Sequence, residues 1–107
     1  MKMKNLNLLN TVPLQNGFRF FTERGKYTEI NATSKVEFVE KLQTVPIQSV
    51  IFHFQRQDFQ KWLKNTIGDK ELAKRINQIK AMFPYESLKK ELFKTLQNRI
   101  TELQKHP

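Results

Sequence analysis

The side chains best suited to chemistry gather between His53 and Trp62. His53, Arg56 and Asp58 bring an imidazole, a guanidinium and a carboxylate close together in the sequence. Asp58 could cap the helix that follows it and pair with Arg56 or His53, and Trp62 would pack beneath. Two interpretations stay open: a capped and packed helix junction, or a small pocket for a ligand or partner.

Nucleophilic catalysis would need a nucleophile, a base and a group that orients the base. Ser49 stands one helical turn before His53, so the two side chains could touch. The chain has no cysteine, and Ser34 and Ser87 are better explained as helix caps. We therefore expect a helix-internal serine beside a half-buried histidine, no catalytic residue, and a protein that is not an enzyme.

Metal and cofactor motifs are absent from the sequence. His106 stands next to the C-terminal residue, and His53 has no histidine or glutamate at helical ligand spacing, so we expect no metal site. The glycines at positions 17, 25 and 68 match neither the dinucleotide fingerprint nor the phosphate-binding loop. We expect no cofactor.

Basic side chains outnumber acidic ones. Lys and Arg total 19 against 10 Asp and Glu, which gives a formal net charge of +9. This balance favours nucleic acid, an anionic membrane or an acidic protein as partner, although interleaved charges also suit a merely solvated surface. The residues that a polyanion would contact are Arg24, Lys26, Lys61, Lys64, Lys70, Lys74 and Arg75.

Length and composition predict one cytoplasmic domain. A chain of 107 residues fits a single domain, and the absence of cysteine excludes a disulfide scaffold. We find neither a signal-peptide core nor a stretch long enough to cross a membrane, and expect no membrane partner. Residues 1–16 form a lead-in to a domain over residues 17–105.

Strand-forming residues around Gly25 predict a β-hairpin. We favour a three-residue turn, which puts Phe18, Phe20 and Ile30 on one face. A two-residue turn would bring Phe21 onto that face instead. The expected pairs are Phe20 with Thr28 and Phe18 with Ile30.

Start and stop signals predict about five helices after the hairpin. Ser34 and Glu37 form a capping box, and Pro46 suits the first turn of a helix whose sequence also fits a strand. Gly68 is a good stop. The helices should begin at Ser34, Pro46, Asp58, Asp69 and Ser87. The sequence thus predicts an α+β, helix-dominated domain with an N-terminal hairpin packed on these helices.

Helical spacing also predicts which side chains face inward. The last helix has a clean apolar stripe, which would become a dimer or protein-partner surface if it exceeded what a small core can cover. Its residues are Leu88, Leu92, Leu96, Ile100 and Leu103. The other inward sets are Val36, Val39 and Leu42; Ile47, Val50, Ile51 and Phe54; Phe59, Trp62 and Leu63; and Leu72, Ile76, Ile79 and Phe83.

Four segments have a recognisable pattern: GFRFFTERGKYTEINATS, VEFVEKLQTVPIQSVIFHFQ, RQDFQKWLKNTIGDKELAKRI and PYESLKKEL. The most specific pieces are Val45-Pro46 leading to Phe52-His53, and Asp58-Phe59 leading to Trp62-Leu63. Together they resemble a family of small prokaryotic proteins known as domain of unknown function 5752. The resemblance covers about four fifths of the chain. It implies the fold boundaries, and no established activity accompanies it.

The function that we expect is therefore a non-enzymatic binding or regulatory module that engages a larger macromolecular partner. Its small size, the absence of a catalytic set and the charge of +9 favour this interpretation. The alternative is a basic protein associated with nucleic acid or the ribosome.

Overall fold

The computed structural model describes residues 8–79 and 85–105 and confirms the predicted α+β architecture. A two-stranded antiparallel hairpin precedes five helices within these residues. The elements are η1 (Leu14–Asn16), β1 (Phe18–Glu23), β2 (Lys26–Ala32), α2 (Lys35–Thr44), α3 (Ile47–Arg56), α4 (Asp58–Trp62), the π-helical turn η2 (Leu63–Ile67), α5 (Lys70–Asn77) and α6 (Tyr85–Lys105).

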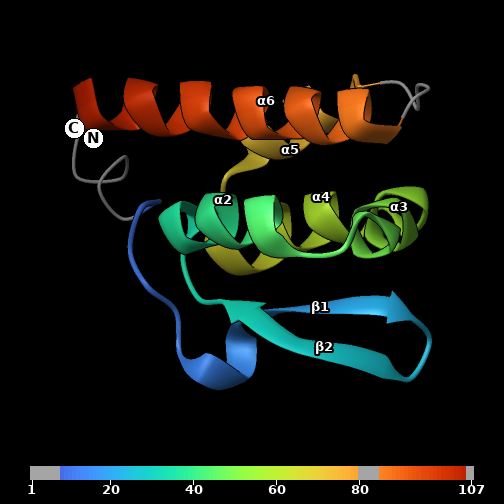
Figure 1. The fold of residues 1–107 in the computed structure, drawn as a ribbon. Coiled ribbons are helices and arrows are strands. Elements are labelled where there is room, and N and C mark those ends of the chain that lie inside the picture. The colour runs from blue at the N-terminus through green and yellow to red at the C-terminus, as the bar shows by residue number, and fades with distance from the viewer. Residues whose placement is uncertain (1–7, 80–84, 106–107) are drawn as a thin grey trace.

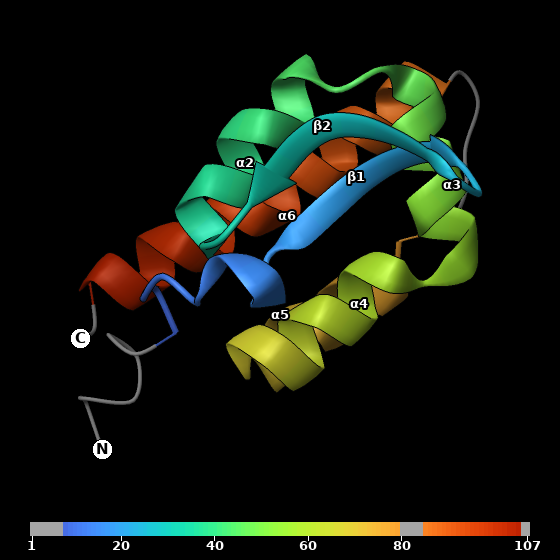
Figure 2. The ribbon, with the colours of Figure 1, turned by 90° about the horizontal axis from the view of Figure 1, so that it is seen from below.

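The helices enclose the core between the hairpin and α6. The hairpin lies on one side of α2, α3 and α4, and α6 crosses the opposite side (Figure 1). Seen from the hairpin side, β1 and β2 run between α2 and the pair α4 and α5 (Figure 2). This arrangement leaves the hairpin beside both α3 and α4, which is where the candidate site forms.

The hairpin register differs from the one that we favoured. Glu23 pairs with Lys26 around a two-residue turn, Phe18 pairs with Ala32, and Phe20 pairs with Ile30. The cause is a bulge in β2, a type of irregularity that re-aims a strand. The Thr28 hydroxyl donates to the carbonyl of Phe20 at 2.7 Å and accepts from the amide of Ile30 at 3.1 Å.

The bulge also decides which aromatic side chains enter the core. Glu29 within it has a left-handed φ of 67°, which is unusual for a residue with a side chain. Phe18 and Phe20 are buried as predicted, and Ile30 packs against the same core. Phe21 pairs irregularly with Tyr27 and is only half-buried, so it does not join them.

Helix α2 begins as predicted and buries Val39 and Leu42 as predicted, but its first turn differs from the prediction. The Ser34 hydroxyl accepts from the Glu37 amide at 3.1 Å, and Glu37 reaches back to the Thr33 amide at 2.7 Å. Val36, predicted to face inward, is exposed, whereas Lys35 is completely buried. Helical spacing could not show this because it ranked the charged residue as the outer one.

Lys35 is held by a buried carboxylate. Its amine donates to Asp69, which begins α5, and Arg99 of α6 donates to the same carboxylate at 3.0 Å. Burial favours a raised pKa for Asp69, but hydrogen bonds from Arg99, Lys35 and the Leu72 amide outweigh it and hold that pKa below its usual value. Burial lowers the pKa of Lys35 despite Asp69. The ion pair joins α2, α5 and α6.

The middle segment is helical, which removes the strand alternative for residues 47–56. Val50 is buried, and Ile47 and Phe54 pack against the core. Gln57, in the left-handed conformation with φ of 62°, turns the chain from α3 into α4. The helix predicted over residues 58–67 is confirmed, with its second half π-helical, and Gly68 ends it with φ of 89°.

Helix α6 covers the core with the predicted stripe. All five stripe residues are buried within the chain, so the stripe is not available as a partner surface. Full burial of each such side chain contributes about 1.5 to 3 kcal/mol. Ser87 lies inside the first turn, because α6 already includes Tyr85, and so does not cap the helix. Phe83, predicted as a core residue, lies outside the described residues.

The lead-in contacts the rest of the molecule along residues 8–16. Leu9 and Val12 pack against the core, and the Val12 amide donates to the carbonyl of Thr33 at 2.7 Å.

Within residues 8–79 and 85–105, no helix is long and apolar enough to cross a membrane.

Candidate functional site

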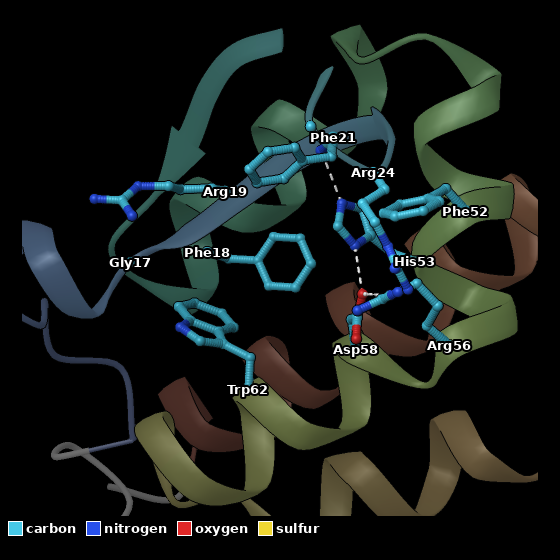
Figure 3. Close-up of a pocket in the computed structure, with 11 residues that line it drawn as sticks. Gly17, Phe18, Arg19, Phe21, Arg24, Phe52, His53, Arg56, Asp58 and Trp62 are labelled. Carbon is cyan, nitrogen blue, oxygen red and sulfur yellow. Dashed lines mark hydrogen bonds and ion pairs between the residues drawn. The ribbon is translucent and has the colours of Figure 1, made fainter. Parts of the chain in front are cut away.

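A cavity of about 390 Å³ opens between the hairpin and helices α3 and α4. Its lining combines aromatic rings, arginines, two glycines, a histidine and one carboxylate (Figure 3). The lining residues are Gly17, Phe18, Arg19, Phe21, Arg24, Gly25, Phe52, His53, Arg56, Asp58 and Trp62. It therefore contains the four residues of the predicted junction: His53, Arg56, Asp58 and Trp62.

His53 connects the hairpin to α4 through both ring nitrogens. Its Nε2 atom accepts a hydrogen bond from the backbone amide of Phe21 at 2.8 Å. Its Nδ1 atom lies 2.8 Å from the Asp58 carboxylate. Figure 3 shows the ring between these two partners. The Phe21 amide lies beside the β2 bulge, so the backbone irregularity and the histidine contact occur at the same place.

The two partners determine the protonation state of His53. An amide can only donate, so Nε2 carries no proton, and Nδ1 must carry the proton that it donates to the carboxylate. Burial, opposed by the hydrogen bond and charge of Asp58, lowers the pKa of His53 below its ordinary value of 6.5. The ring is therefore neutral at neutral pH.

Asp58 pairs with both His53 and Arg56, as predicted. It does not cap the helix, contrary to the prediction, because it is the first residue of α4. The Arg56 Nε atom donates to Asp58 at 3.0 Å, and its guanidinium lies 5.0 Å from the ring centroid of Phe52. This cation–π contact places a positive charge over an aromatic face of the cavity.

Trp62, predicted to pack beneath Asp58, lines the cavity on the far side of Phe18 from His53. Its indole stacks on Phe38 at 5.5 Å between ring centroids, and its Nε1 atom donates to the Asn16 carbonyl at 2.9 Å. Phe18 lies between the two ends of the cavity, 4.8 Å from His53 and 5.7 Å from Trp62. Two neighbouring rings and one backbone carbonyl thus position the indole.

Ser49 makes no hydrogen bond to His53, although helical spacing allowed one. Its hydroxyl is buried and has no hydrogen-bond partner among the described residues. His53 uses its two nitrogens on Phe21 and Asp58 instead. The side chains therefore form no nucleophile and base pair.

The sequence interpretation missed several cavity residues. The sequence places Phe21 in the hairpin and Phe52 in the following helical segment, without indicating that either lines the cavity, and it gives no signal for Arg19. Phe52 could have been found from the sequence because it directly precedes His53. In the helical segment, His53 faces the hairpin. Nothing in the sequence indicated that the Phe21 amide binds His53. The backbone bulge beside this contact has no sequence motif that would predict it.

The predicted polyanion contacts are divided between different places. Arg24 lines the cavity from the hairpin tip, where Lys26 is exposed beside it, whereas Arg75 is engaged by Glu71 at 2.9 Å and Glu102 at 2.8 Å. These contacts raise the pKa of Arg75, chiefly through Glu102. The remaining four lysines, Lys61, Lys64, Lys70 and Lys74, line a second cavity between α4, η2 and α5.

Comparison with known proteins identifies the family. The model of a family of unknown function (DUF5752) matches residues 2–97. The chain belongs to this family. No curated protein and no solved structure matches it.

In the part of this DUF5752 protein that the structure describes, residues 8–79 and 85–105, no three side chains of the His, Cys, Asp and Glu types come together as a metal site. The cavity has apolar rings inside and arginines at its rim, a composition found at the centre of protein interfaces.

Proposed function

We propose that this protein is a non-enzymatic binding module that engages a larger macromolecular partner through the cavity beside His53. The occupant that best fits is an aromatic or apolar side chain of a partner protein with carboxylates next to it. The observation that supports binding over catalysis is the engagement of both His53 nitrogens, by the Phe21 amide and by Asp58.

The walls suit an apolar anchor. Phe18, Phe21, Phe52 and Trp62 contribute rings to the cavity, whose volume of about 390 Å³ lies in the range of small ligand sites. Aromatic anchors in such pockets supply much of the affinity of protein interfaces.

The rim suits negative charge. Asp58 is the one carboxylate of the lining, and it is already engaged by His53 and Arg56. Arg19 and Arg24 are exposed and have no ion pair among the described residues. In Figure 3, Arg19 extends away from the other labelled side chains, so Arg24 is the arginine that we assign to the occupant.

The experiment is selection of binders from a display library of random peptides. Enriched peptides should carry an aromatic residue flanked by Asp or Glu. Arg24→Glu should weaken their binding by about 2 kcal/mol or more, roughly thirtyfold. Lys90→Glu, an exposed change on α6 with the same charge difference, should leave the affinity unchanged. Selection of no common motif, or equal binding by Arg24→Glu, would contradict the proposal.

A further inference from the structure

The second cavity, about 460 Å³ between α4, η2 and α5, is the lysine groove. Lys61 and Lys64 form one wall, and Lys70 and Lys74 form the other. None of the residues that line it is acidic. It lies on a different side of α4 from the arginine-rimmed cavity, since the two share no lining residue.

We propose that the lysine groove binds the phosphate backbone of a single nucleic-acid strand. This inference does not depend on the proposed function of the cavity beside His53, because it rests on different residues. A strand lying along the groove would meet ammonium groups from both walls.

The charges of the groove are uncommitted. All four lysines are exposed, and the ion pairs and side-chain hydrogen bonds between described residues involve none of their ammonium groups. The nearby acid Glu71 is engaged by Arg75 and does not line the groove. Arg75 and Arg99, by contrast, are occupied by carboxylates. A ligand phosphate would therefore not have to displace an internal partner.

Side-chain spacing suits repeated charges. Lys61 and Lys64 are three residues apart, and Lys70 and Lys74 are four apart. Residues at these separations are neighbours on one face of a helix. Gln60 of α4 donates to Asn77 of α5 at 3.3 Å, which joins the two walls. The groove thus presents two short lysine rows on walls that are held together.

The composition of the groove favours nucleic acid over an acidic protein. Its other lining residues are four amides, Gln57, Gln60, Asn65 and Asn77, and one small apolar residue, Ala73. Lysine is depleted at protein interfaces, which need an apolar centre that this groove lacks. Lysine and amide side chains are common donors to phosphates. No aromatic ring lines the groove, so contacts should be to the backbone and largely independent of sequence.

The test measures the binding of labelled oligothymidine, oligouridine and duplex DNA. Fluorescence anisotropy gives the binding constant at each concentration of a salt series. Four neutralised phosphates predict a slope of about −2.8 for log K against log salt. Affinity should then fall about fiftyfold between about 50 mM and about 200 mM salt. Replacing one groove lysine with Ala should reduce that fall to about twentyfold.

A matched pair of variants locates the site. Glutamine at Lys61, Lys64, Lys70 and Lys74 should abolish binding of the single strands. Glutamine at Lys41, Lys90, Lys94 and Lys105, which line neither cavity, removes the same charge and should retain most of the binding. Thermal unfolding of both variants checks that they are folded.

Four results would overturn the inference. The first two are no binding of any oligonucleotide at low salt and equal loss of binding in the two variants. The third is tighter binding of the duplex than of the single strands. The fourth is tighter groove-dependent binding of polyglutamate than of oligothymidine, which would assign the groove to an acidic protein. Preference for oligouridine over oligothymidine would support RNA as the source of the strand. Arg24→Glu should leave oligonucleotide binding unchanged.

Discussion

Helix α4 separates two positively charged regions that differ in almost every other property. The cavity beside His53 combines arginines with aromatic rings, and hydrogen bonds fix its walls. The lysine groove combines lysines with amides, and its charges have no partners among the described residues. A net charge of +9 therefore describes two surfaces with different chemistry. We therefore expect the two surfaces to select different partners, because arginines beside aromatic rings and lysines beside amides favour different ligands.

The two regions are also anchored differently. The cavity depends on a neutral histidine between the Phe21 amide and Asp58. The α5 wall of the groove begins at Asp69, whose buried carboxylate binds Lys35 and Arg99. Removing the Asp69 carboxylate should lower the free energy of unfolding more than removing the His53 ring. The reason is that a buried charge without a partner is less stable than a buried amide without one.

The largest effect should come from Asp69→Asn. Asparagine can still cap α5, but it leaves the Lys35 amine buried without a carboxylate. We expect a loss of about 3 to 5 kcal/mol in the free energy of unfolding, measured by urea denaturation. Lys35→Met, which removes the buried cation and leaves Asp69 with Arg99, should cost less. A loss below about 1 kcal/mol for Asp69→Asn would show that the ion pair does not anchor α5.

His53→Ala should have the next largest effect. The Phe21 amide loses its acceptor and the core gains a void, so we expect a loss of about 2 to 3 kcal/mol. Ser49→Ala is the matched change on the same helix. Its hydroxyl is buried without a partner among the described residues, so its removal should leave stability unchanged or raise it by about 1 kcal/mol. Equal losses in the two variants would remove the special role of His53.

The pH dependence of stability should also report on the His53 clamp, by which we mean its two hydrogen bonds to the Phe21 amide and the Asp58 carboxylate. The folded pKa of His53 lies below 6.5, so the unfolded chain binds more protons between the two values. The contribution of His53 is complete above 6.5 and is lost as the pH falls from there toward the folded pKa. Urea denaturation from about pH 8 to about pH 5 should show this decline in the wild type and a smaller one in His53→Gln. Identical pH profiles would contradict the assignment.

The smallest effect should come from the groove. Lys61→Ala and Lys64→Ala remove exposed side chains and should change the free energy of unfolding by less than about 0.5 kcal/mol each. Their effect should appear only in oligonucleotide binding. A large stability loss would show that these lysines hold the structure together and are not available to a ligand.

Local signals in the sequence predicted most of the helices. Ser34 and Gly68 mark helix ends through interactions within a few residues, and the structure confirms both. The His53, Asp58 and Trp62 cluster was also predictable, since these residues are close in the sequence and the last two share a helix.

Contacts across the chain could not be predicted in this way. Phe21 contacts His53 from 32 residues away, and Lys35 contacts Asp69 from 34 residues away. The first lies beside a bulge that changes the hairpin register. The second depends on a lysine turning inward at a position that helical spacing gives to Val36. Both are set by tertiary packing, which local patterns do not contain.

The most direct test of the central claim, that His53 is a fixed clamp in a binding cavity, is its nitrogen NMR spectrum. Long-range proton–nitrogen correlation distinguishes the two ring nitrogens across a pH titration. We predict a proton on Nδ1, an unprotonated Nε2, and a pKa below 6.5. A proton on Nε2, or a pKa at or above 6.5, would contradict the clamp and make His53 available for proton transfer.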